Sequence, residues 1–298
     1  MQHLRTIKLI LMILSKCIAF HSYKGGTGKT TIAANLAATL AKRGNVVALI
    51  DLDIYAPSLS SYFSCYHPKN WVNDFLEEKV SIHDILIDYT SILGETNGKL
   101  YIAFSNYHKD EIYKLDININ QIQNSQLSLF RNFILLKEEI MRKKEADYII
   151  IDTSPGVRFW SINALAISDI ILLMLKFGDL DFDGTKLMCE EIYSSFSKFG
   201  TKSYLLLNKV EGYCTPPLIN IEESQKKQKV FNHNSHSLPK NKILETLTED
   251  IQIDVLSQIP CYCDIQFDQK EYLTALNFPN HPFVKNIELI AKILSDTK

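Results

Sequence analysis

The sequence lacks a strong net charge, a long apolar run and any stretch dominated by proline or glycine. A formal charge of -2 over 298 residues gives no overall case for nucleic-acid binding, although it does not exclude a local basic patch. With only 9 prolines and 11 glycines, the sequence shows no proline- or glycine-rich linker that would divide the chain into two domains. The chain is long enough, and with 46% hydrophobic residues apolar enough, for one large domain to bury its own core.

The start of the chain resembles a signal peptide, because the basic residues Arg5 and Lys8 precede an apolar run at residues 9–14. That run is far too short to span a bilayer, and no small-residue cleavage site follows it. We therefore expect residues 1–15 to be a short extension, or an overlong gene start with Met12 as the true first residue. An extension that touches a membrane is the less favoured alternative.

Cysteine is also sparse, and its six copies are scattered over positions 17, 65, 189, 214, 261 and 263. Scattered cysteines, two of them inside apolar runs, are typical of reduced thiols in a cytosol. The composition therefore predicts a cytoplasmic protein.

A glycine-rich stretch at residues 24–31 is the strongest motif. The apolar residues 17–21 before it suit a buried strand, and residues 31–41 after it are rich in helix formers. Between a strand and a helix, glycines let backbone N–H groups point at a polyphosphate, and the helix N-terminus adds its partial positive charge. We expect nucleotide contacts from Gly25, Gly26, Thr27, Gly28, Lys29, Thr30 and Thr31. Lys29 would neutralise the β- and γ-phosphates, and the Thr30 hydroxyl would ligate Mg²⁺.

Carboxylates end two further apolar runs. Residues 46–50 lead to Asp51 and Asp53, and residues 148–151 lead to Asp152. Ligands of an open α/β sheet bind at the carboxyl ends of its strands, so these side chains should lie near the glycine-rich loop. Asp152 would hold Mg²⁺ through a coordinated water, because Mg²⁺ keeps several of its waters.

The loop departs from the ordinary G-x-x-x-x-G-K-[ST] pattern, since Tyr23 replaces the first glycine and Lys24 adds a second lysine. In this it resembles the deviant Walker A motif of the MinD/ParA/ArsA-type P-loop ATPases, and the resemblance extends over residues 16–294. It implies that Lys24 reaches the partner's nucleotide across a dimer interface, and that Asp53 positions or activates the attacking water. It also implies that Asn208 hydrogen-bonds adenine and that Pro260 belongs to a second base-binding loop.

The function implied by the resemblance is Mg²⁺-dependent ATP hydrolysis that switches the chain between an ATP-bound homodimer and a monomer. Such a switch would act with an activating protein partner to position or partition a cargo. The sequence does not decide whether it also contacts DNA or a membrane. One alternative is an ATP-dependent iron–sulfur cluster carrier or metalloenzyme maturation factor, since the residues after Asp53 resemble that branch. That branch uses a C-x-x-C motif, and the C-x-C spacing of Cys261 and Cys263 in this chain differs from it. Another alternative is a non-switching biosynthetic or kinase-like enzyme, for which no acceptor-site feature is visible.

The remaining pattern predicts a doubly wound, mainly parallel α/β sheet with helices on both faces, the P-loop NTPase fold. Further strands are expected at residues 99–105, 169–175, 203–207 and 253–259, and helices at residues 127–144, 183–199 and 284–294. Residues 16–298 are interpreted as a single domain with a polar insertion at about 222–242. His233 and His236, within that insertion, have a ligand-like spacing but are expected to be solvated rather than to bind a metal.

Overall fold

A computed structural model describes residues 15–63, 68–106, 108, 123–176, 179–210, 253–266 and 270–297. The expectations for residues 1–14 and for the polar insertion at 222–242, with His233 and His236, lie outside this part of the chain.

The described strands form one eight-stranded sheet in the order β3-β4-β2-β5-β1-β6-β7-β8. All neighbours run parallel except β3, which is antiparallel to β4. The strands are β1 Lys16–His21, β2 Val46–Leu52, β3 Ile87–Asp88, β4 Lys99–Ala103, β5 Tyr148–Thr153, β6 Ile170–Lys176, β7 Lys202–Val210 and β8 Val255–Pro260. The predicted doubly wound, mainly parallel sheet is thus confirmed.

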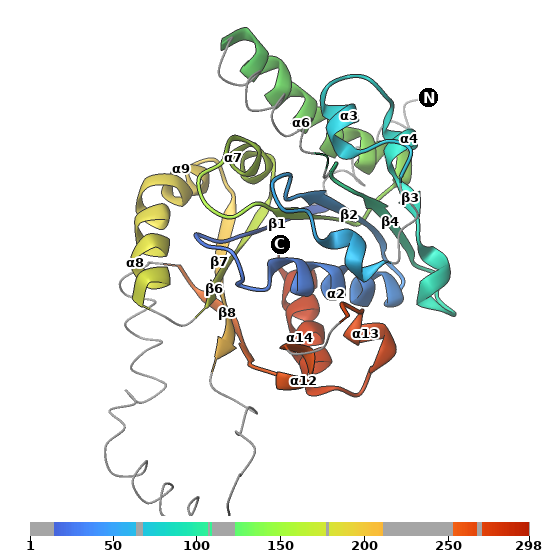
Figure 1. Ribbon diagram of the computed structural model, residues 1–298, viewed down its shortest axis with the longest axis vertical. Helices are drawn as coiled ribbons and strands as arrows, with labels where there is room; N and C mark the ends of the chain where they lie inside the picture. Colours follow the sequence, from blue (N-terminus) through green and yellow to red (C-terminus); the bar gives the residue numbers. More distant parts are fainter. Residues whose placement is uncertain are drawn as a thin grey trace, which may run out of the picture.

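Helices cover both faces of the sheet (Figure 1). The helices are α2 Lys29–Lys42, α3 Val72–Leu76, α4 Ile82–Ile85, α6 Gln123–Lys144, α7 Phe159–Ala166, α8 Asp179–Met188, α9 Ser194–Ser197, α12 Cys263–Gln266, α13 Thr274–Asn277 and α14 Pro282–Asp296. Short 3₁₀ turns occupy η1 Leu59–Tyr62 and η2 Thr90–Leu93, and a π-helical turn occupies η3 Cys189–Tyr193. The single helix expected at residues 183–199 is therefore interrupted by a π turn.

Two apolar clusters, one on each face, hold the helices to the sheet. Helices α3, α4, α6, α7 and the end of α8 pack on one face, and α2 with α14 packs on the other. Strand β5, with three consecutive isoleucines, is buried along its whole length, as expected for a central parallel strand covered on both sides. Helix α2 is buried throughout residues 32–41, and its many alanines allow a close approach to the sheet.

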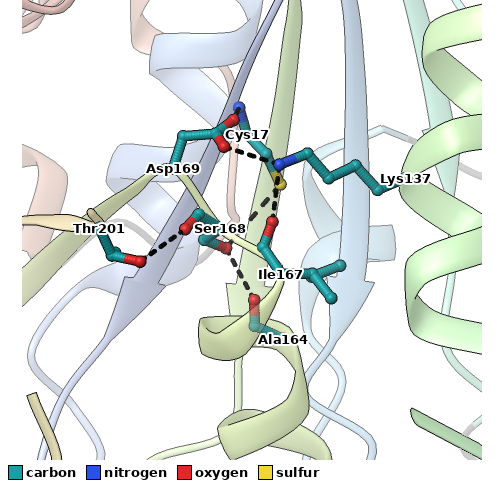
Figure 2. A network of polar contacts seen from close by, with 7 residues as sticks. All are labelled: Cys17, Lys137, Ala164, Ile167, Ser168, Asp169 and Thr201. Carbon is teal, nitrogen blue, oxygen red and sulfur yellow. Dashed lines mark hydrogen bonds and ion pairs between the residues drawn. The ribbon is translucent and has the colours of Figure 1, made fainter. Parts of the chain in front are cut away.

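The amino ends of the strands are closed by a polar network centred on Asp169 (Figure 2). The Lys137 ammonium of α6 donates to Asp169 Oδ1 at 2.7 Å and to the Ile167 carbonyl at 2.8 Å. Asp169 Oδ2 in turn accepts the Cys17 backbone N–H at 2.8 Å. A cavity of about 660 Å³ lies beside this network, also lined by Lys16 and Lys202. It lies at the opposite end of the strands from the glycine-rich loop.

The cysteines only partly match the expectation of reduced thiols. Cys17 and Cys189 are buried free thiols, and burial raises the pKa of each to about 12. Cys263, at the start of α12, is instead disulfide-bonded, so the expectation is wrong for this residue. Among the described helices, none combines the length and the apolar character that a membrane crossing would need.

Candidate functional site

The strand order brings the three predicted loop regions to one edge of the sheet. Strand β5 lies between β1, which leads into the glycine-rich loop, and β2, which leads to Asp53. In the parallel registers, Asp152 of β5 lies opposite both Phe20 of β1 and Asp51 of β2. The glycine-rich loop, Asp51 and Asp152 therefore meet at the carboxyl ends of three adjacent strands, as the sequence predicted.

The glycine-rich loop has the backbone conformation that a phosphate cradle needs. Gly26 and Gly28 have φ angles of 75° and 88°, in the left-handed region that favours glycine. Gly28 is the N-cap of α2, and the helix begins at Lys29. The N-terminus of this 14-residue helix therefore faces the loop with its unpaired backbone N–H groups and its partial positive charge.

The Lys29 ammonium is buried at the base of this loop. Lys29 is 6% exposed, and its Nζ donates to Ser22 Oγ at 3.0 Å. Ser22 Oγ donates in turn to the Lys24 carbonyl at 2.6 Å, which ties the two ends of the loop together. Burial lowers the pKa of Lys29, and the nearby carboxylates of Asp152 and Asp53 oppose that effect by stabilising the charged form.

Asp152 provides two buried oxygens that fit a magnesium site. Within the part of the chain that the structure describes, neither carboxylate oxygen makes a hydrogen bond of normal geometry, although the side chain is 1% exposed and the Thr30 hydroxyl lies close enough to lower its pKa. Burial raises the pKa of Asp152 to about 7, and the charge of Lys29 limits the rise. A buried carboxylate without a partner is costly unless a cation or ordered water meets it. Its oxygens, together with the Thr30 hydroxyl, are hard donors of the kind that Mg²⁺ prefers.

Asp53 is held at the end of β2 by the segment that follows β5. Asp53 Oδ1 accepts the Ser154 hydroxyl at 2.7 Å and the Ala56 backbone N–H at 3.3 Å. Asp51 lies deeper, accepts the Asp53 backbone N–H at 3.0 Å, and has a pKa raised well above its ordinary value by burial and by the charge of Asp152. Asp51 thus supports the backbone, while Asp53 is the carboxylate that lies at the site.

A separate cavity of about 130 Å³ lies beside the first turn of α2. It is lined, among others, by Gly28, Thr31, Asn208, Lys209 and Pro260. Asn208 Nδ2 donates to the Thr27 carbonyl at 2.7 Å, so the end of β7 is attached directly to the glycine-rich loop. The cavity brings together the residues for which the resemblance implies base contacts.

Lys24 and Gly25 lie on the exposed outer side of the loop. The Gly156 backbone N–H donates to the Ser22 carbonyl at 2.8 Å, so the turn after β5 contacts the start of the loop. Lys24 therefore lies away from the buried Lys29, on a side that a second molecule would be able to reach.

Sequence reasoning missed three polar residues that organise the site: Ser22, Ser154 and Ser58. Ser22 and Ser154 hold Lys29 and Asp53, and Ser58 Oγ donates to Thr30 Oγ1 at 3.2 Å. Each lies within a few residues of a recognised motif, but serine is common in loops. Only the folded geometry shows which hydroxyl meets which group.

Comparisons with known proteins agree with this geometry. Residues 15–202, more than half of the chain, match the profile of the AAA domain family. The chain belongs to this family. Its fold is that of the MinD/ParA-type P-loop ATPases, which confirms the resemblance. The septum site-determining protein MinD of Pyrococcus horikoshii, solved with Mg-ADP, superposes with a TM-score of 0.67 at 18% identity and covers 94% of this chain and 96% of its own.

Two curated relatives in the sequence comparison match a shorter segment. An uncharacterized ATP-binding protein of Methanocaldococcus jannaschii is 34% identical over 168 residues, covering 55% of this chain and 54% of that protein. The sporulation initiation inhibitor protein Soj of Bacillus subtilis is 27% identical over 164 residues, covering 55% of this chain and 59% of Soj. The match thus spans less than two thirds of either relative.

Proposed function

We propose that this AAA-domain chain is an Mg²⁺-dependent ATP hydrolase that acts as a dimerisation switch and positions or partitions a cargo. The observation that carries the proposal is the meeting of Lys29, Asp152 and Asp53 at one edge of the sheet, beside the N-terminus of α2. These groups match what phosphoryl transfer needs, which is positioning and charge neutralisation.

The residues have separable roles in this proposal. Gly25, Gly26, Thr27 and Gly28 cradle the polyphosphate with backbone N–H groups, and Lys29 neutralises its charge. Thr30, and Asp152 through water, would hold Mg²⁺, and the bound ion would neutralise part of the phosphate charge. Asp53, fixed by Ser154, orients the attacking water and accepts its proton.

Adenine is the base that best fits Asn208. One N–H of its amide is committed to the Thr27 carbonyl. The second N–H and the Oδ1 acceptor then remain to pair with adenine N7 and N6. Guanine offers two acceptors, N7 and O6, on the same edge, and O6 would oppose Oδ1. The relative named as an ATP-binding protein supports the same choice.

Lys24 supports the dimer part of the proposal. Lys29 already neutralises the phosphates from within the loop, while Lys24 is exposed on the loop's outer side. If two chains met face to face, each Lys24 would reach the phosphates bound by its partner and add charge stabilisation present only in the dimer. The proposal does not specify the identity of the cargo or of the activating partner, or whether the chain contacts DNA or a membrane.

The test uses Asp53→Ala, which should bind Mg-ATP and hydrolyse it slowly, so that the ATP-bound state accumulates. Size-exclusion chromatography with light scattering should show a dimer with Mg-ATP and a monomer without it. Adding Lys24→Ala should restore the monomer while ATP binding remains. A Lys24→Ala protein that still dimerises on ATP and hydrolyses it at the normal rate would refute the switch.

A further inference from the structure

Helix α6 carries a second row of apolar side chains besides the one that faces the core. The first row is fully buried against the sheet and consists of Phe133, Leu136 and Ile140. The second row lines the cavity of about 660 Å³ at the amino ends of the strands and consists of Phe130, Ile134 and Met141. Ile134 is still 38% exposed. A helix on the surface of a domain needs one apolar face, so the second row indicates that a further apolar element covers it.

The lysines that line this cavity are already engaged within the fold. Lys137 Nζ donates to Asp169 Oδ1 and to the Ile167 carbonyl, as Figure 2 shows. Lys16 Nζ donates to two carbonyls at the end of α14, at 2.7 and 2.9 Å. Lys202 likewise has an interaction within the chain. The surface that the cavity leaves uncovered is mainly apolar, so an apolar occupant fits it better than a charged ligand does.

The chain enters the sheet at the rim of this same cavity. Ser15 and Lys16 both line it. Ser15 Oγ donates to the Ala146 carbonyl at 2.7 Å, and the Lys16 backbone N–H donates to the Asp147 carbonyl at 2.9 Å. These bonds fix the point at which residues 9–14, which lie outside the described part of the chain, are attached to it. The six residues are all apolar, and a segment of this length reaches at most about 20 Å.

We propose that the cavity is the docking site of residues 9–14 of the same chain. The run covers the second apolar row of α6, and the apolar surface of both is removed from water. Because the run is tethered at Ser15, the contact is intramolecular and needs only a modest affinity. The run, too short to cross a bilayer, thereby has a place in the fold. The site lies at the opposite end of the strands from the glycine-rich loop and does not depend on the proposed function.

Photo-crosslinking of the full chain tests the contact directly. Ile134 is replaced by p-benzoylphenylalanine, which reacts with neighbouring C–H bonds on illumination. Trypsin, which cuts after Lys8 and Lys16, then releases residues 9–16 as one peptide. We expect this peptide to be joined to the α6 peptide of the same chain, with a yield that does not fall on dilution. The matched control has the same probe at Phe278, which is 55% exposed beside α13 and should not label residues 9–16.

Thermal unfolding of the full chain gives an independent readout. Leu11→Ser combined with Ile13→Ser should lower the midpoint by about 3–6 °C, because their buried apolar surface is lost. In an Ile134→Asp background the same pair should change the midpoint much less, since docking is already lost there. Gln2→Ser combined with His3→Ser, outside the apolar run, is the control and should leave the midpoint unchanged.

Several results would overturn the proposal. A crosslink from Ile134 to a second chain, with a yield that falls on dilution, would show that another copy covers the cavity. Equal labelling of residues 9–16 from Phe278 and from Ile134 would show that the contact is not specific. Without the crosslink, co-sedimentation with phosphatidylglycerol vesicles that is lost in the Leu11 and Ile13 variant would assign the run to a lipid surface. Equal effects of that variant in the wild-type and Ile134→Asp backgrounds would also contradict docking.

Discussion

The Ser154 hydroxyl donates to Asp53 Oδ1 at 2.7 Å across 101 positions of the chain. Ser154 follows β5 and Asp53 follows β2, two adjacent strands whose last residues lie in register. The bond links the segment after Asp152 to the carboxylate proposed to orient water. The Ser154 hydroxyl therefore couples the position of the Asp53 carboxylate to the segment that follows Asp152.

Ser154→Ala should slow ATP hydrolysis about 10-fold while leaving Mg-ATP affinity close to that of the wild type, because only the orientation of Asp53 is lost. Asp53→Ala should slow it about 100-fold or more, since the group itself is removed. Single-turnover phosphate release measures both. Ser168→Ala is the control, because this buried serine makes a 2.7 Å bond to Ala164 at the opposite end of the sheet. Equal rates in Ser154→Ala and wild type would remove the positioning role.

Lys29→Ala should abolish Mg-ATP binding, because the β- and γ-phosphates would meet the carboxylates of Asp152 and Asp53 without the intervening cation. Isothermal titration calorimetry checks this. Lys42→Ala, exposed at the other end of the same helix, should bind as the wild type does. Wild-type affinity in Lys29→Ala would show that the glycine-rich loop is not the phosphate site.

Gly28→Ala should impair both folding and nucleotide binding. An added Cβ would lie 2.4 Å from Asn208 Nδ2, and its φ of 88° strains any L-residue. We expect a loss of about 1–2 kcal/mol in the free energy of unfolding, together with loss of ATP binding. Gly44→Ala, with a φ of 98° and no atom of the described residues within 4 Å of the new Cβ, is the matched control. It should show a similar loss of stability in urea unfolding but retain ATP binding, and a parallel loss of binding would contradict the steric argument.

His21 should make the protein less stable in acid. Burial, and then the charge of Lys29, lowers the pKa of His21 to about 3, below its ordinary value of 6.5. Between these values the unfolded chain binds a proton that the folded chain does not, so stability rises with pH through this window and is lost as pH falls. A difference of one bound proton between the unfolded and folded states changes the free energy of unfolding by about 1.4 kcal/mol per pH unit.

Urea unfolding from pH 4 to pH 7 tests this, using the slope of the free energy of unfolding rather than its absolute value. The raised pKa values of Asp152 and Asp51 contribute a slope of the opposite sign in this range. His21→Gln should therefore shift the slope toward more negative values, by up to about 1.4 kcal/mol per pH unit, whereas His83→Gln, at an exposed position on α4, should leave it unchanged. An equal slope in His21→Gln and wild type would show that another group controls acid stability.

Much of the fold could be predicted because its signals are local. The apolar strands ending in Asp51 and Asp152 and the glycine-rich loop before an alanine-rich helix each occupy a short stretch. Parallel strands covered on both faces need continuous apolar runs, and a phosphate loop needs glycines, so sequence and structure agree there. The π turn at η3 was not predicted, since a π turn differs from an α-helix by a single backbone shift and carries no strong residue signal.

The sequence by itself determined the class of fold, the phosphate loop and the strand ends that carry the carboxylates, because these depend on residue types over a few positions. Only the tertiary structure decided which side chains meet across the sheet. The bonds from Ser22 to Lys29, from Ser154 to Asp53 and from Asn208 to Thr27 depend on strand order and register. The left-handed Lys209 depends on a shift between β7 and β8. Such contacts join residues far apart in the chain, so no local pattern specifies them.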